Sequence, residues 1–155
     1  MSLDDDIRLI AEAPIFADLN SDQLRLLAFG AERLTAREGQ VLFRQGDIAD
    51  FAVVIASGEV AMTVATDAGD KLIKNATRPS LLGQLALITK TERAVTAVAA
   101  NDVGVLRINQ SLFHRMLREY PETAAAIHAQ IRRDLEALLK DIANIEGRFA
   151  RVRDL

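Results

Sequence analysis

Glycines divide the middle of this chain into short apolar segments, and this feature limits the fold more than any other. Gly39, Gly46, Gly58 and Gly69 stand between segments whose apolar residues recur with a period near two. Short apolar segments with turn residues between them are typical of antiparallel strands. The segments are 41–43, 51–56, 60–65 and 72–76. We therefore expect a mainly β fold, an antiparallel sandwich or jelly roll.

Helices are expected before this β region. Residues 4–13 begin with acidic side chains, which the helix dipole favours in a first turn. Pro14 ends that helix. Ser21 is the expected N-cap of a second helix over 23–29, and Gly30 ends it by the usual preference for glycine after a helix.

Two more strands and a helix are expected after these segments. Residues 94–99 and 103–108 predict two further strands, and either Asn109 or Ser111 is expected to cap a helix that runs through Glu119. The chain then divides into a helical lead-in (1–30), a β-roll (31–109) and C-terminal helices (110–155).

The stretch 82–96 joins a glycine turn, a short apolar helical turn and an arginine. Because Gly83 precedes the helical turn, the first N–H groups of that turn have no helical partner, and the helix dipole favours negative charge beside them. Arg93 follows closely enough to fold back over these groups as a planar, permanently charged fork. The stretch therefore predicts a binding site for a phosphate.

This stretch also resembles the phosphate-binding cassette of cyclic nucleotide-binding domains. The family's cassette reads Phe-Gly-Glu-Leu-Ala-Leu and then Arg-Ala-Ala-Thr. This chain has Gly83-Gln84-Leu85-Ala86-Leu87 and Arg93-Ala94-Val95-Thr96 at the same separation. The resemblance covers the chain from about Leu19 through the last helix. It implies the cupin-like jelly roll and the regulatory, non-catalytic role of Crp/Fnr-type sensors and kinase regulatory subunits.

The resemblance implies a role for each cassette residue. The backbone N–H groups of Leu85 and Ala86 and the guanidinium of Arg93 would hold the cyclic phosphate. Gln84 would bind the ribose. Relatives that prefer cyclic GMP often have a threonine directly after the arginine, where this chain has Ala94, so cyclic AMP is the expected ligand and cyclic GMP the alternative. The implied ligand-binding residues are Gly83, Gln84, Leu85, Ala86, Arg93 and Ala94.

Four residues outside the cassette are candidates for the base side of the site. Met62 and Lys74 fall on strands that would line it, although a core methionine and a surface lysine are the plainer interpretations. Leu138 and Leu139 fall near the place where the last helix covers the base in relatives. They would supply only apolar cover.

The cassette departs from the family pattern at two positions. Gln84 stands where the family has a glutamate that accepts a hydrogen bond from the ribose 2′-hydroxyl. A neutral acceptor weakens that bond by about 1 to 2 kcal/mol, or about tenfold, and the lost negative charge beside the phosphate partly offsets this. Val95 is bulkier than the family's alanine. Upstream, the segment 78–80 lacks a glycine that relatives have, so we expect a tighter connection there.

Composition excludes several other classes of protein. Without any cysteine the chain has no disulfides, thiolate metal sites, iron–sulfur clusters or cysteine nucleophiles. His114 and His128 do not have the spacing of a helical metal pair. No Walker lysine, nucleophile elbow or catalytic triad pattern is present. We therefore expect no cofactor, no metal, no catalytic residues and no enzyme activity.

The chain is expected to be soluble and cytoplasmic. Its longest apolar runs, 51–56 and 94–100, are far shorter than the ~20 residues that a membrane span needs. Its first residues are acidic, whereas a secretory signal begins basic. The net charge of −3 gives no overall basic surface for nucleic acid.

Residues 121–146 predict the longest helix and a homodimer. From Ile131 onward the apolar positions alternate steps of four and three, which is the pattern of a heptad seam. Because a single domain offers little surface on which to bury such a length, we expect a second copy to cover it. The seam positions are Ile131, Leu135, Leu138, Ile142 and Ile145.

Three functions remain open at this point. The first is a cyclic nucleotide sensor that transmits ligand binding to its C-terminal helix. The second is an interaction module whose cassette has lost the ligand and whose helix recruits a protein partner. The third, a Crp/Fnr-type transcription regulator, needs a helix-turn-helix unit after the long helix. Because the sequence stops at Leu155, we expect no direct nucleic-acid binding by this chain.

Overall fold

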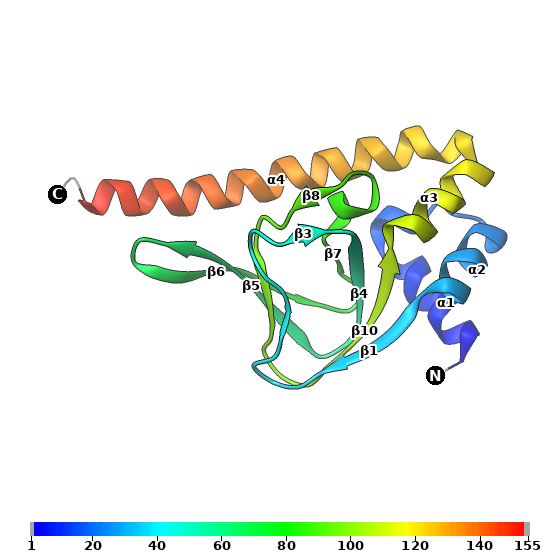
Figure 1. The fold of residues 1–155 in the computed structure, drawn as a ribbon, viewed down its shortest axis with the longest axis horizontal. Coiled ribbons are helices and arrows are strands. Elements are labelled where there is room, and N and C mark those ends of the chain that lie inside the picture. Colours follow the sequence, from blue (N-terminus) through cyan, green and yellow to red (C-terminus); the bar gives the residue numbers. More distant parts are fainter. Residues whose placement is uncertain (1, 154–155) are drawn as a thin grey trace.

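The computed structural model describes residues 2–153, with side chains for residues 2–145, so the last part of the predicted 110–155 unit lies outside it. N-terminal helices, a β-roll and a long C-terminal helix follow one another (Figure 1). The elements are α1 (Leu3–Glu12), a 3₁₀ turn (Pro14–Phe16), α2 (Ser21–Gly30), β1 (Glu32–Ala36), β2 (Val41–Phe43), β3 (Ile48–Ala49), β4 (Phe51–Ser57), β5 (Glu59–Thr66), β6 (Gly69–Thr77), β7 (Leu81–Leu82), the 3₁₀ turn η2 (Gln84–Leu87), β8 (Thr91–Glu92), β9 (Thr96–Ala99), β10 (Val103–Asn109), α3 (Gln110–Glu119) and α4 (Pro121–Arg153).

Two antiparallel sheets form the roll. One has the strand order β1-β10-β4-β7 and the other β2-β9-β5-β6, and β3 pairs with β8 beside them. This arrangement confirms the expected antiparallel jelly roll with flanking helices. The two-residue strands β3, β7 and β8 were not predicted, because segments this short carry no periodicity.

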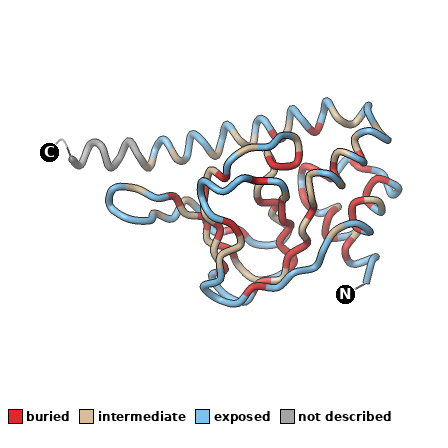
Figure 2. The backbone as a smooth tube through the Cα atoms, viewed as in Figure 1, coloured by how far each residue is buried: buried red, intermediate tan, exposed pale blue. Residues whose placement is uncertain are grey.

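Strand β4 is buried on both faces because it lies between two hydrophobic cores. Val53 and Ile55 point into the roll, whereas Val54 points to the opposite face and packs with the helices. This double burial explains why 51–56 is a continuous apolar run instead of an alternating one. Buried residues gather along β4 and on the inner sides of the N-terminal helices (Figure 2).

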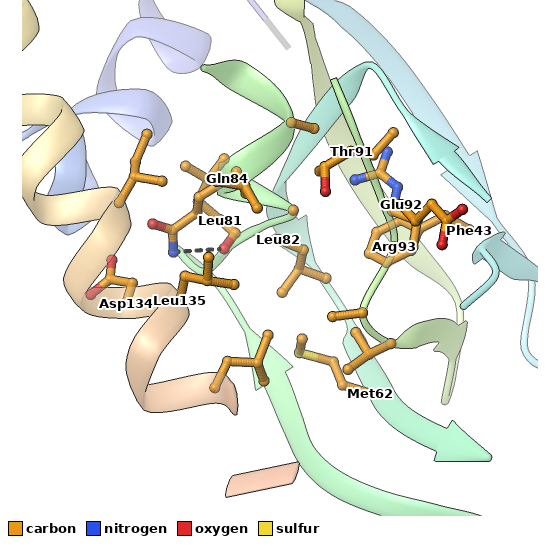
Figure 3. A pocket seen from close by; sticks show the side chains of 18 of the residues that line it. Phe43, Met62, Leu81, Leu82, Gln84, Thr91, Glu92, Arg93, Asp134 and Leu135 are labelled. Atoms are coloured by element: carbon orange, nitrogen blue, oxygen red, sulfur yellow. Dashed lines mark hydrogen bonds between the residues drawn. The ribbon is translucent and has the colours of Figure 1, made fainter. Parts of the chain in front are cut away.

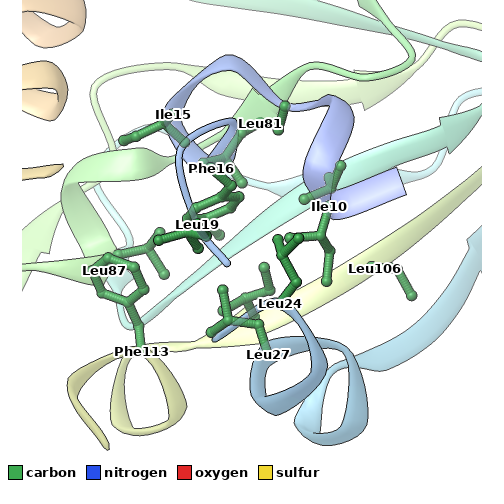
Figure 4. Packing of buried hydrophobic residues seen from close by; sticks show 14 of the residues in the cluster. Ile10, Ile15, Phe16, Leu19, Leu24, Leu27, Leu81, Leu87, Leu106 and Phe113 are labelled. Atoms are coloured by element: carbon green, nitrogen blue, oxygen red, sulfur yellow. The ribbon is translucent and has the colours of Figure 1, made fainter. Parts of the chain in front are cut away.

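The core on the helix side joins the N-terminal helices to α3. Phe16 and Phe113, both fully buried, have ring centroids 6.2 Å apart, and aliphatic side chains from the helices surround them (Figure 4). Leu87, the last residue of η2, belongs to the same cluster. The cassette (82–96) is therefore packed against the helices as well as against the roll.

Both N-terminal helices begin with reciprocal caps. At α1, Asp5 donates its N–H to Ser2 Oγ at 3.2 Å, and Ser2 donates its N–H to Asp5 Oδ2 at 3.0 Å. At α2, Asn20 and Gln23 exchange two equivalent bonds of 2.9 Å. The predicted cap at Ser21 is wrong by one residue, because Asn20 has the partner at the third helical position that closes the capping box.

Helix α4 runs unbroken past its expected end at residue 146. Gly147 costs only about 1 kcal/mol in a helix interior and does not end it. Ile131 is fully buried in the helix-side core, and Leu138 and Ile142 pack against the core of the roll. The chain therefore buries Ile131 itself and covers part of Leu138 and Ile142, which is more of the seam than we expected from the sequence.

Two smaller differences concern the starts of β9 and α3, and one expectation is met just before the cassette. Strand β9 begins at Thr96, two residues later than expected. Asn109 is the N-cap residue of α3, but its side chain accepts from Arg107 Nε at 3.1 Å instead of capping the helix. The connection before the cassette is tight, as expected, because Ser80 donates its N–H to the Thr77 carbonyl at 2.8 Å.

Candidate ligand-binding site

A cavity of about 240 Å³ lies between the cassette, the roll and α4 (Figure 3). Met62 and Lys74, the two candidates on the strands, line it. Helix α4 forms the wall that faces the cassette. The structure brings all six predicted ligand-binding residues to this cavity: Gly83, Gln84, Leu85, Ala86, Arg93 and Ala94.

Gly83 gives the cassette its sharp entry. Its φ of +79° lies in the left-handed region, which glycine adopts freely and other residues adopt only with strain. A Cβ atom at this position would collide with Nη1 of Arg93. The glycine therefore allows the guanidinium to approach the cassette backbone closely.

The short turn η2 offers fewer free N–H groups than the sequence suggests. Ala86 donates its N–H to the Gly83 carbonyl at 3.1 Å. The N–H groups of Gln84 and Leu85 open the turn and have no partner within it. In this conformation the predicted phosphate contact therefore fits Leu85, whereas the N–H of Ala86 is already engaged.

Arg93 is held firmly while two of its donors stay unused. Only 6% of the residue is exposed. Its backbone bonds the loop before β3, donating to the Asp47 carbonyl at 2.8 Å and accepting from the Gly46 N–H at 2.9 Å. Nη2 donates to the Phe51 carbonyl at 2.7 Å. Nε and Nη1 are buried and have no hydrogen-bond partner among the described residues.

The electrostatics of Arg93 follow from its burial. Burial lowers the pKa of this guanidinium to about 10. The negative charges of Asp50 and Asp47 raise the pKa, and the positive charge of Arg107 lowers it further. At neutral pH Arg93 is therefore still a cation, with less water around it than an exposed arginine has.

Gln84 occupies the other side of the cavity. It points toward α4, where Asp134 and Leu135 also lie (Figure 3). Its Nε2 donates to the Leu81 carbonyl at 3.5 Å, which is long for a hydrogen bond. Its Oε1 is buried without a partner in the described part of the chain. A buried carbonyl left unpaired costs about 1 to 3 kcal/mol, so a ligand hydroxyl that reached it would be stabilised.

Helix α4 brings only one of its two predicted leucines to the site. Leu138 lines the cavity, whereas Leu139 is 49% exposed. Successive helical residues point about 100° apart, so the two cannot share a face. Sequence reasoning missed Asp134 and Asp141, which also line the cavity. Their spacing from Leu138, four residues before and three after, places them on its face and was the available signal.

Sequence reasoning also missed two aromatic residues beside Arg93. The guanidinium carbon lies 4.2 Å from the ring centroid of Phe43 and 4.5 Å from that of Phe51. Both residues stand at ends of expected strands, but nothing in their spacing connects them with the arginine. The two phenylalanines lie on strands of different sheets, β2 and β4, and the packing of the roll brings them to Arg93.

A β-roll that carries a glycine-led cassette, a buried arginine and a covering C-terminal helix is the architecture of one class of protein. Residues 33–120 match the family model described as the cyclic nucleotide-binding domain. The chain belongs to this family. The resemblance noted in the cassette is thereby confirmed over more than half of the chain.

Particular relatives agree with this assignment. The chain is similar to the cAMP-dependent protein kinase regulatory subunit of Candida albicans, with 27% identity over 124 residues, which are 80% of this chain and 26% of that protein. The corresponding subunit of Eremothecium gossypii is 32% identical over 66% of this chain and 22% of that protein. The chain thus spans about a quarter of these curated relatives.

One solved structure is more similar to this chain, and the match spans almost the whole of that structure's chain. The cyclic nucleotide-binding-like protein from Brucella abortus is 42% identical, with a TM-score of 0.68 over 74% of this chain and 98% of that one. Together these similarities define a regulatory domain of the cyclic nucleotide-binding type.

Among the helices that the structure describes, each is too short or too polar to cross a lipid bilayer.

Proposed function

We propose that this chain is a non-catalytic sensor domain of the cytoplasm that binds cyclic AMP, with cyclic GMP as the weaker ligand. The observation that carries the proposal is the pair of unsatisfied groups in one cavity: the buried N–H donors of Arg93 and the buried carbonyl of Gln84. A cyclic phosphate is an anion that accepts hydrogen bonds, and a ribose 2′-hydroxyl donates one. A single nucleotide offers both partners.

The phosphate binds at the turn of the cassette. Arg93 supplies charge and the Nε–H and Nη1–H donors, and the Leu85 N–H at the start of η2 supplies a neutral donor. A contact from the Ala86 N–H requires its bond to the Gly83 carbonyl to lengthen. We infer that the phosphate also takes the Ala86 N–H, as the resemblance implies, and that this reshapes η2.

The reshaped turn acts on the helices through contacts that are already in place. Gln110, the first residue of α3, donates from Nε2 to the Ala86 carbonyl at 3.0 Å. Leu87 is packed in the same core as Ile131 of α4. A displacement of η2 therefore moves α3 and α4, and it becomes a signal because the ligand binds the two helix positions with unequal affinity.

A second copy of the chain is the proposed partner of α4. Ile131 is buried and Leu138 and Ile142 are partly buried against the chain's own cores, so we place the dimer surface on the face that carries the half-exposed Leu139. This moves the predicted interface to the side of the helix that faces away from the roll.

The proposed function is tested by the thermal unfolding of the full chain in cyclic AMP and in cyclic GMP. A ligand present at about 100 times its dissociation constant adds about 2.7 kcal/mol to the free energy of unfolding. We expect both nucleotides to stabilise the protein, cyclic AMP at lower concentration, and Arg93→Ala to need about hundredfold more nucleotide for the same stabilisation. An unfolding curve of the unmodified protein that neither nucleotide changes would favour the interaction module instead.

A further inference from the structure

The cationic group of the cassette is in contact with two aromatic rings. The guanidinium carbon of Arg93 lies over the ring of Phe43 at 4.2 Å from its centroid and over the ring of Phe51 at 4.5 Å. Both distances are within the range in which a ring face attracts a cation. Figure 3 shows Arg93 beside Phe43 at the wall of the cavity.

A buried cation can be stabilised in two ways that differ in what they leave for a ligand. A carboxylate neutralises the guanidinium and occupies its N–H groups. An aromatic face attracts the charge and accepts none of the in-plane N–H bonds. Among the described residues, the guanidinium of Arg93 is bonded through Nη2 alone, to the Phe51 carbonyl, and Asp47 and Asp50 influence it without bonding Nε or Nη1.

We propose that Phe43 and Phe51 are positioning residues for anion binding: their ring faces stabilise the charged guanidinium and leave its Nε–H and Nη1–H for the ligand. The inference deepens the proposed function, since the anion in question is the cyclic phosphate. Neither phenylalanine bonds the phosphate. They act through Arg93.

The backbone places both rings rigidly. Phe43 ends β2, where it is paired with Ala97 of β9, and Phe51 begins β4, where it is paired with Asn109 of β10. Phe51 contributes twice, because its carbonyl fixes Nη2 while its ring contacts the guanidinium face. The same ring lies 4.2 Å from the guanidinium carbon of Arg107, so a second positive charge stands close to the anion site.

Leucine and tyrosine substitutions separate the ring face from apolar bulk. Phe43→Leu keeps apolar volume and loses the ring, whereas Phe43→Tyr keeps the ring. Calorimetric titration with cyclic AMP should show about tenfold weaker binding for Phe43→Leu and for Phe51→Leu, and binding within about twofold of the unmodified protein for Phe43→Tyr. Phe16→Leu, the same change in the helix-side core, is the control: it should lower stability and leave the affinity unchanged.

A second readout needs no ligand and therefore separates this inference from the proposed function. The NMR signal of the Arg93 Nε–H should carry a ring-current shift that both leucine variants reduce and Phe43→Tyr retains. If the unmodified protein binds neither nucleotide, the proposed function fails and this shift alone decides the ring contact.

Two results would overturn the inference. One is an Arg93 signal that neither leucine variant changes. The other is equal loss of affinity in Phe43→Leu and Phe43→Tyr. That result would show that binding depends on the shape of the side chain and not on its ring face. If Phe43→Leu does not fold, Phe51→Leu gives the answer, because Phe51 is only half-buried.

Discussion

Arg93 keeps its positive charge although it is buried, and the proposed binding of the phosphate depends on that charge. Burial lowers the pKa of its guanidinium to about 10 in the folded protein, while in the unfolded chain the group keeps its ordinary, higher pKa. The folded state thus loses the proton first. The cost of burying the charge is fully present below about pH 10 and is relieved as the pH rises from there toward the ordinary value.

The first prediction concerns this titration. We expect the affinity for cyclic AMP to be constant around neutral pH and to fall as the pH rises past about 10, because the neutral side chain no longer attracts the phosphate. Calorimetric titrations over that range measure it. Arg93→Met, which has no such group, serves as the control for other alkaline effects. Undiminished affinity well above that pH would contradict the assignment.

The second prediction concerns the ribose. Gln84→Glu should bind cyclic AMP about tenfold more tightly, because the 2′-hydroxyl then donates to a charged acceptor. The analogue 2′-deoxy cyclic AMP has no such hydroxyl and should gain nothing from the substitution. Dissociation constants of both ligands for both proteins give the answer. If the substitution shifts the two ligands equally, Gln84 does not contact the ribose.

At the scale of elements, α4 is the part whose position matters most for the cavity. Its residues form one wall, and its burial holds it against the roll. The third prediction compares two of its residues. Ile131→Ala should lower the free energy of unfolding by about 3 kcal/mol, because Ile131 is fully buried.

Leu139→Ala is the matched control for that prediction. Its side chain is half-exposed on the same helix, so we expect a change within about 0.5 kcal/mol. Urea unfolding at low protein concentration measures both variants. Small, equal effects would mean that α4 does not dock on its own chain.

The elements also show how far the sequence alone could lead. Glycine turns and period-two segments predicted most strands of the roll, because both signals are local. The docking of Ile131 and Ile142 against the same chain was missed, since it depends on a surface that forms only when distant strands assemble. Asn20 was missed as a cap because Ser21, next to it, has an equally suitable side chain.

The residues of the candidate site also fall into those that the sequence predicted and those that it missed. The glycine turn and Arg93 lie close together in sequence and predicted an anion site, and the resemblance to the family cassette supplied the other residues of the predicted six. Phe43 and Phe51 come to Arg93 from two different sheets as the roll packs together, and no spacing rule connects them with it. The engaged N–H of Ala86 was also hidden, because a 3₁₀ turn and an α-helical turn have the same sequence pattern here.

The whole molecule is proposed to act as a pair. The fourth prediction is that the unmodified protein sediments as a dimer and Leu139→Glu as a monomer, because a charge on the exposed face of α4 would have to be desolvated at the interface. Leu72→Glu, an exposed apolar residue of β6, is the matched substitution away from α4 and should leave the dimer intact. If the unmodified protein sediments as a monomer, the proposed dimer through α4 is wrong.

The central claim is that one nucleotide satisfies both the donors of Arg93 and the carbonyl of Gln84. Isothermal titration of the full chain with cyclic AMP tests it most directly. The account predicts one nucleotide bound per chain and about hundredfold weaker binding in Arg93→Ala, since two charge-assisted hydrogen bonds are lost. Absence of binding to the unmodified protein, or equal binding to Arg93→Ala, would contradict it.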